Sequence, residues 1–363
     1  MSAPKASGRT ISHVFDFGAT TGASFVPLIA ALAREVCAQG DHFVAFATEV
    51  PGATWPGELR AAGAEVHLVR KDAEVVAGLR ALQPEIVHTH FTRYDLPALR
   101  GAPQARIFWH VHSHREDLSP KARIRAFLKY RILGRRVEAI VAISEVIRAE
   151  CVAWFTPADR VRLVYNAIDP AHFHPTTPEQ RAAARNEFGI AESDRVVLFF
   201  ERTPYKGGAT LREALTQLQS AGSGDADTSN GGPRLLVLGG TKADRDLFGS
   251  APRVISVERV ADARNAYWAA DALVFPSYNE AFGAVIIEAL ACGLPIAASD
   301  IPVVHEICDG VPSVFVFPPG DAAALAQALT RAISCTGTAG GRQRVIDRFS
   351  LARWTRDILA LYG

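Results

Sequence analysis

Short β-branched runs alternate with longer helical patterns along nearly the whole chain, and this alternation is the strongest constraint on the fold. Residues 24–40, for example, place apolar side chains every three to four positions, and Gly40 supplies a stop signal. This order is typical of parallel strands covered by helices on both faces, so the sequence predicts an α/β fold. The strands predicted in the first half are 13–17, 42–48, 64–69, 86–90, 106–112, 138–144 and 162–166.

The alternation starts again after residue 178, and the intervening segment 166–178 is rich in proline and has no period. At roughly 150 residues per domain, a chain of 363 residues suggests two domains. We predict doubly wound, Rossmann-like domains over 1–168 and 169–349. The amphipathic helix at 350–363 is expected to pack back on the first domain. The strands predicted in the second half are 196–200, 234–240, 254–257, 272–277, 295–299 and 314–317.

Composition narrows the functional classes. The 39 basic and 38 acidic side chains nearly cancel, which argues against nucleic acid as a partner. Five cysteines without a CxxC pair fit a reducing cytoplasm, and no signal-peptide pattern or apolar run of about 20 residues is present. We therefore expect a cytoplasmic protein.

The segment 121–136, KARIRAFLKYRILGRR, carries seven basic residues and no acid, with apolar residues interleaved at helical spacing. This pattern indicates either peripheral contact with an anionic membrane, at its inner face, or a covered helix with a solvated basic face.

Candidate site residues follow the predicted strands, where doubly wound folds place their functional loops. Glu280 lies in the loop after 272–277, and Gly283 opens a helix whose backbone N–H groups could meet a phosphate or sugar oxygen. Glu288 lies within that otherwise apolar helix, where a carboxylate requires a partner. Two carboxylates so placed could hold different parts of one ligand, or could simply be a helix-terminal charge and an ordinary helical glutamate.

Two further loops carry candidates. Arg202 and Lys206 follow the strand 196–200 next to a glycine pair, which suits a diphosphate or two solvated cations. The loop after 13–17 contains Gly22 but lacks the G-x-G-x-x-G spacing, which argues against NAD.

Histidines concentrate on two neighbouring strands, with HTH at 88–90 and His110, His112 and His114 alternating on the next. Alternating histidines can bind a metal, but a metal-dependent hydrolase also needs carboxylate ligands and usually a closed barrel. We favour one histidine at a strand end that faces the site, with most of the others structural.

Three motifs together resemble glycosyltransferase family 4, a group of retaining enzymes with the GT-B fold. NEAFGAVIIEALACGLPIAASD (279–300) resembles the donor-site motif of that family and its following strand. VYNAIDPAHFHP (164–175) is similar to the family's linker, and EAIVAISEVIRAE (138–150) to one of its strand and helix-start segments. The resemblance covers nearly the whole chain.

The resemblance implies roles for individual residues. Arg202 and Lys206 match the cations that hold the donor diphosphate, and Glu280 matches the carboxylate near the transferred sugar. The remaining positions match a loop touching sugar and phosphates (Phe282, Gly283), a ribose-binding residue (Glu288), a histidine reaching the reacting sugar (His112), a glycine of the amino-domain loop (Gly22) and a base contact (Val260).

The implied activity is transfer of a sugar from a nucleotide-sugar donor, UDP- or GDP-linked, to an acceptor hydroxyl, with the anomeric configuration retained. The donor is a co-substrate, and the sequence calls for no metal and no other cofactor. Two alternatives stay open: an inactive glycosyltransferase-like partner protein, and another GT-B enzyme such as a nucleotide-sugar epimerase.

Overall fold

The computed structural model describes residues 8–22, 24–114, 119–153, 157–201, 204–221, 232–239, 248, 253–257, 260, 262–335 and 340–363. The chain divides into two compact units. The amino unit contains Met1–Ala167 and Leu351–Gly363, and the carboxyl unit contains Ile168–Ser350. The chain therefore leaves the amino unit once and returns to it at the last helix.

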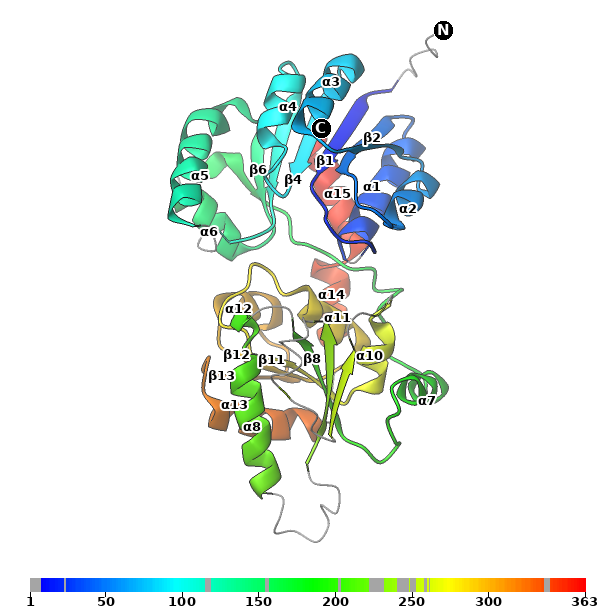
Figure 1. Ribbon diagram of the computed structural model, residues 1–363, viewed down its shortest axis with the longest axis vertical. Coiled ribbons are helices and arrows are strands. Elements are labelled where there is room, and N and C mark those ends of the chain that lie inside the picture. Colours follow the sequence, from blue (N-terminus) through cyan, green and yellow to red (C-terminus); the bar gives the residue numbers. More distant parts are fainter. Residues whose placement is uncertain are drawn as a thin grey trace. The chain divides into compact units, whose positions relative to one another are not determined.

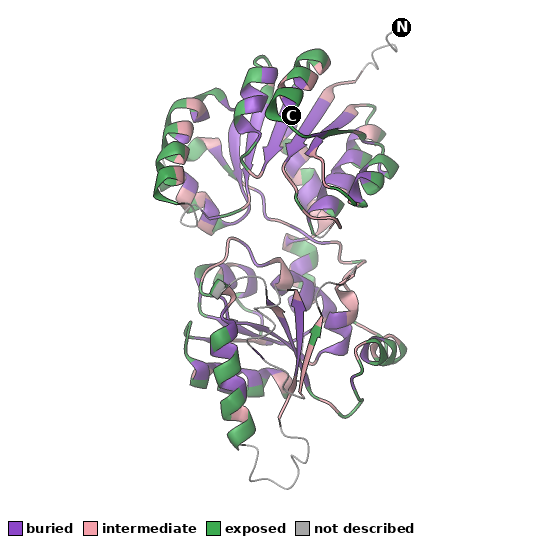
Figure 2. Ribbon diagram, viewed as in Figure 1, coloured by how far each residue is buried: buried purple, intermediate pink, exposed green. Residues whose placement is uncertain are grey.

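The sheet of the amino unit has seven parallel strands in the order β3-β2-β1-β4-β5-β6-β7. The order reverses between β1 and β4, so the sheet is doubly wound, as the sequence predicted. Strands β4 and β6 are buried along their whole length (Figure 2). The strands are β1 (Thr10–Phe15), β2 (His42–Thr48), β3 (Glu65–Val69), β4 (Ile86–His90), β5 (Arg106–Val111), β6 (Ala139–Ala142) and β7 (Val161–Leu163).

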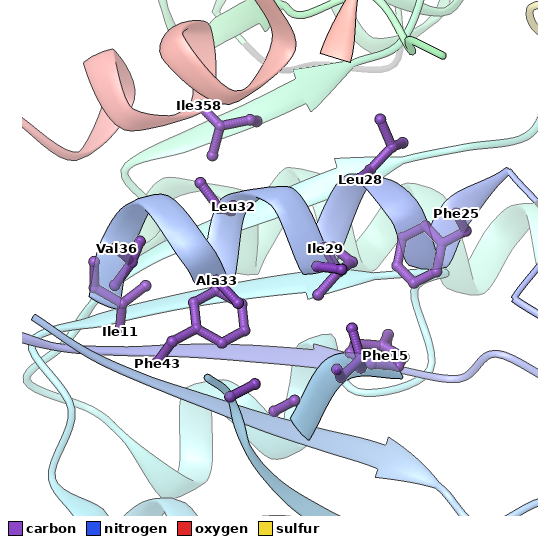
Figure 3. Close-up of a cluster of buried hydrophobic side chains, with 14 of the residues drawn as sticks. Ile11, Phe15, Phe25, Leu28, Ile29, Leu32, Ala33, Val36, Phe43 and Ile358 are labelled. Atoms are coloured by element: carbon purple, nitrogen blue, oxygen red, sulfur yellow. The ribbon is translucent and has the colours of Figure 1, made fainter. Parts of the chain in front are cut away.

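Helices cover this sheet, and the last one in the chain joins the first (Figure 1). Helix α1 lies between the sheet and α15. Its Leu32 faces Ile358 on one side, while Ile29 and Ala33 face the strand residues Ile11 and Phe43 on the other (Figure 3). The described helices of the unit are α1 (Phe25–Ala38), α2 (Trp55–Ala61), α3 (Asp72–Leu82), α4 (Asp95–Gly101), α5 (Pro120–Leu133), α6 (Glu145–Ala153) and α15 (Leu351–Tyr362), with short 3-10 turns η1 (Gly134–Arg136) and η2 (Ala158–Arg160).

The carboxyl unit repeats the plan with six parallel strands in the order β10-β9-β8-β11-β12-β13. Here the order reverses between β8 and β11. Two doubly wound Rossmann-like units in one chain confirm the predicted α/β architecture. The strands are β8 (Val196–Glu201), β9 (Arg234–Gly239), β10 (Val254–Val257), β11 (Ala272–Phe275), β12 (Ile296–Ser299) and β13 (Val314–Phe317).

The helices of the carboxyl unit begin at recognisable caps. Thr177 and Gln180 form a reciprocal capping box at the start of α7, and the Asp321 side chain accepts from the Ala324 N–H at the start of α13. The described helices are α7 (Pro178–Glu187), η3 (Pro204–Lys206, a 3-10 turn), α8 (Gly208–Ala221), α10 (Arg264–Ala269), α11 (Ala284–Cys292), α12 (Pro302–Cys308), α13 (Ala322–Ile333) and α14 (Gly341–Arg348). Within the part of the chain that the structure describes, no helix has the length and apolar character needed to cross a lipid bilayer.

Candidate functional site

The carboxyl unit gathers its candidate residues where its strand order reverses. Lys206 lies in η3 after β8, and Glu280 lies in the loop after β11, the next strand in the sheet. Between these loops the backbone approaches closely: a Cβ on Gly207 would lie 2.0 Å from the Pro276 carbonyl oxygen, and Gly207 has φ +76°. Only glycine fits this contact, so the chain holds the two loops together at the crevice where ligands bind in open α/β sheets.

Lys206 and Glu280 form an ion pair, with side chains only 16% and 13% exposed. The Ser277 hydroxyl donates to the same Glu280 oxygen at 3.2 Å. The Lys206 ammonium also lies 5.6 Å from the centroid of the Phe275 ring. This pair therefore offers one cation and one carboxylate, already partly desolvated, at a single spot. Arg202, the other predicted diphosphate ligand, lies outside the described residues.

Helix α11 begins just beyond this pair. Gly283 caps it in the left-handed conformation, at φ +85°. The Ile286 N–H donates to the Gly283 carbonyl oxygen at 3.0 Å, and the Ala284 and Val285 N–H groups precede any acceptor that the helix provides. Phe282 is buried, with its ring 5.9 Å from that of Phe349, so the loop before the helix is anchored. The arrangement leaves a helix N-terminus, with its positive dipole end, near the charged pair.

Glu288 lies on α11 and is 8% exposed. The Tyr267 hydroxyl donates to its Oε2 at 2.5 Å, which supplies the partner that a carboxylate on an apolar helix requires. Sequence reasoning missed Tyr267, since nothing in residues 264–269 marks it, and it also passed over Ser277.

Val260, the predicted base contact, is half-buried and lies outside any helix or strand.

The amino unit holds the other two predicted residues: Gly22 follows β1, at the reversal in the strand order, and His112 follows β5, the strand beyond β4. Gly22 precedes α1 and accepts a hydrogen bond from the Val26 N–H at 3.0 Å. A Cβ there would lie 3.1 Å from both Glu58 Oε2 and Val26 Cβ, so the loop packs tightly. The ring of Phe25, at the start of the same helix, meets the imidazole of His112 edge-on at 5.7 Å.

His112 follows directly after β5 and is half-buried. The ring of Phe91 lies 4.6 Å away, and burial lowers the pKa of His112 to about 3. His112 is therefore neutral at physiological pH and can either donate or accept a hydrogen bond.

The neighbouring histidines do not form a good metal site, although nitrogens of His88, His90 and His110 lie within 4.8 Å of one another. The His88 and His90 rings stack 4.8 Å apart at 4° from parallel, so their in-plane lone pairs run side by side and do not converge on one point. Both nitrogens of His90 already have hydrogen-bond partners. His114 does not join the group, since its Nδ1 lies 2.5 Å from Glu150.

Comparison with known proteins places this geometry in a family. The model of Glycosyltransferase Family 4 matches residues 28–172, and the model of Glycosyl transferases group 1 matches residues 194–335. A D-inositol 3-phosphate glycosyltransferase of Salinispora arenicola is 27% identical over 347 residues, covering 85% of this chain and 73% of that protein. An alpha-maltose-1-phosphate synthase of Mycobacterium tuberculosis is 25% identical over 376 residues, covering 94% of each.

A solved structure from Anabaena, in complex with UDP-glucose, superposes with a TM-score of 0.80 at 18% identity, covering 98% of this chain and 99% of that one. The two doubly wound units and this likeness define a GT-B fold. With one family model on each unit, the chain belongs to glycosyltransferase family 4, as its motifs suggested.

Proposed function

We propose that the protein transfers a sugar from a UDP- or GDP-linked donor to an acceptor hydroxyl, with retention at the anomeric carbon. The observation that carries this proposal is the Lys206–Glu280 pair beside the N-terminus of α11. A diphosphate needs cations and N–H donors, and a sugar needs a carboxylate that accepts from its hydroxyls. The UDP-glucose held by the Anabaena structure supports a nucleotide-sugar donor.

In this proposal Lys206, Arg202 and the α11 N–H groups bind the diphosphate and stabilise the charge that develops on it as the bond to the sugar breaks. Because these groups supply the positive charge, the reaction needs no divalent metal. Glu280 orients the sugar, Glu288 the ribose, and His112 reaches the sugar from the amino unit. The acceptor oxygen bonds to the anomeric carbon on the face that the diphosphate leaves, and its proton passes to the leaving phosphate.

The test is a thermal-shift screen against UDP-, GDP-, ADP- and TDP-sugars in EDTA, followed by incubation with candidate acceptors. A ligand at a hundred times its Kd adds about 2.7 kcal/mol, which moves the unfolding midpoint by several degrees. We expect one donor to give such a shift, and NMR of the product to show the donor's anomeric configuration.

Other outcomes contradict the proposal. Binding without turnover over a broad acceptor panel would indicate an inactive partner protein, and a donor altered without any acceptor would indicate an epimerase. A requirement for magnesium would refute the metal-free mechanism. The two relatives' names both contain a phosphorylated small molecule, so inositol phosphates and sugar phosphates head the acceptor panel.

We propose in addition that α5 docks on an anionic membrane. Its Ile124, Leu128 and Ile132 follow one another at every fourth position and are 62%, 48% and 61% exposed. Between and around them, residues 121–136 carry seven basic side chains and no acid. Exposed apolar side chains set among basic ones are typical of helices that lie in a membrane interface.

Binding to vesicles tests this docking. We expect the protein to float with vesicles containing phosphatidylglycerol and not with pure phosphatidylcholine. Replacing Ile124, Leu128 and Ile132 together by serine should weaken vesicle binding by at least about tenfold, because each side chain loses about 1 kcal/mol or more of apolar burial. A control with Leu68→Ser and Ile346→Ser, both 39% exposed and on elements other than α5, should bind normally. Equal binding to both vesicle types would contradict the proposal.

A further inference from the structure

An unbroken chain of close polar contacts runs through the core of the amino unit to His112. The Tyr362 hydroxyl lies 2.8 Å from His13 Nε2, His13 Nδ1 lies 3.0 Å from His90 Nε2, and His90 Nδ1 lies 3.0 Å from His112 Nε2. Tyr362, His13 and His90 are at most 1% exposed. This series of contacts joins Tyr362, on the last helix, to the half-buried imidazole of His112.

Every ring in the chain is neutral, because burial lowers the pKa of His13 and His112 to about 3 and that of His90 well below its usual value. A neutral imidazole has one N–H donor and one bare nitrogen. Each contact between two imidazoles joins Nδ1 of one ring to Nε2 of the other, so the tautomer of one ring dictates the tautomer of its neighbour. Only two arrangements satisfy all three contacts: every ring protonated on Nδ1, or every ring protonated on Nε2.

A side branch decides between the two arrangements. His88 Nδ1 lies 2.7 Å from the Tyr362 hydroxyl, while its Nε2 is buried without a partner among the described residues. Orphaned N–H groups are rarer in protein interiors than under-satisfied acceptors. His88 therefore has its proton on Nδ1 and donates to the Tyr362 oxygen. The Tyr362 hydroxyl is then free to donate to His13 Nε2.

We propose that His90 is a positioning residue: held by His13 and Tyr362, it donates from Nδ1 to His112 Nε2 and so fixes His112 as an Nδ1–H donor. His112 Nδ1 has no partner among the described residues, so this nitrogen is available to donate to a ligand. The acceptor it suits is an oxygen, such as a sugar hydroxyl or ring oxygen. The role of the His112 Nδ1–H as a donor to the sugar rests on the proposed sugar transfer. The tautomer of His112 does not depend on that proposal.

The tautomers are measured directly by long-range ¹H–¹⁵N spectra of the full-length protein labelled in its histidine rings, without any ligand. We expect His13, His88, His90 and His112 to share one form, with Nδ1 protonated and Nε2 bare. Mixed tautomers, or protonation of His112 on Nε2, would overturn the inference.

Two variants of the same position separate hydrogen bonding from packing. His90→Asn keeps an N–H donor near the position of Nδ1, so His112 should stay in the Nδ1–H form and turnover should stay within about twofold. His90→Phe fills the space without a donor, so His112 should populate both tautomers and kcat should fall about tenfold, the effect of one lost hydrogen bond. Equal behaviour of the two variants would refute the positioning role.

His110→Leu is the matched packing control. The His110 ring stacks on those of His90 and His112, at 5.0 and 4.4 Å, but neither of its nitrogens has a partner among the described residues. Its removal should leave the His112 tautomer unchanged. A protein that transfers no sugar, yet shows the shared tautomer, would contradict the proposed function and support this inference.

Discussion

Lys206→Met should lower sugar transfer by about 100-fold or more, because it removes a preorganised cation that stabilises the departing diphosphate. The same change should weaken binding of the free nucleoside diphosphate.

Glu280→Gln should also impair transfer, but it should raise the affinity for the free nucleoside diphosphate. Once the carboxylate charge is gone, Lys206 is no longer neutralised in the empty site, and the nucleoside diphosphate should bind more tightly. Isothermal titration with UDP and GDP, together with initial rates, measures both effects.

A second ion pair in the same unit provides the control. Arg234 and Asp194 have side chains 20% and 12% exposed, close to the values for Lys206 and Glu280. Arg234→Met should reduce stability as a broken, partly buried pair does, while leaving diphosphate affinity and kcat unchanged. If Arg234→Met and Lys206→Met had equal effects on affinity, the loss would reflect general destabilisation and the proposed site would be wrong.

The second large effect is a loss of stability in mild acid. Burial lowers the pKa of His13 to about 3 and holds the pKa values of His88, His90 and His110 well below the ordinary 6.5. Below pH 6.5 the unfolded chain therefore binds protons that the folded chain refuses, so the free energy of unfolding rises with pH and falls on acidification. A histidine that stays neutral in the folded state contributes about 1 kcal/mol between pH 7.5 and 5.5, so the four together contribute several kcal/mol.

This loss is a large share of the stability of a typical domain, so the amino unit should be much less stable near pH 5 than at pH 7.5. Urea unfolding followed by tryptophan fluorescence measures it, since Trp55, Trp109 and Trp354 all lie in this unit. His110→Leu should reduce the pH slope by about one proton. A stability that is flat between pH 7.5 and 5.5 would contradict the prediction.

Much of the fold was predictable because strands buried on both faces stand out as continuous apolar runs. All thirteen predicted strands are present, and 42–48, 86–90, 254–257 and 314–317 match to the residue. The first strand is the instructive error: it was predicted at 13–17 but lies at Thr10–Phe15. Because Ser12 and His13 are polar, the sequence suggests that the strand starts near them, whereas both residues are fully buried within it. His13 tolerates burial because residues 77 and 349 positions away bond to it.

The candidate site was likewise predictable from the sequence only in part. The loops after β8 and β11 could be found because polar and glycine residues follow strands there, but the direct pairing of Lys206 with Glu280 needed the sheet order. Gly283 was predicted to open a helix, and α11 begins directly after it at Ala284, with Gly283 as its left-handed cap. Tyr267, the partner of Glu288, carries no local signal, since its role depends on the packing of α10 against α11.

The two ends of the carboxyl unit lie side by side. The Ile168 N–H donates to the Phe349 carbonyl oxygen at 3.0 Å, and Ile168 pairs with Ser350 as an isolated bridge. In topological terms residues 168–350 are an insertion, looped out of an otherwise continuous amino unit. Truncation after residue 167 would strip α15 and Tyr362 from the amino unit and open its core. Excising the insertion and joining Ala167 to Leu351 through a short linker would instead keep every member of the histidine chain in one small polypeptide.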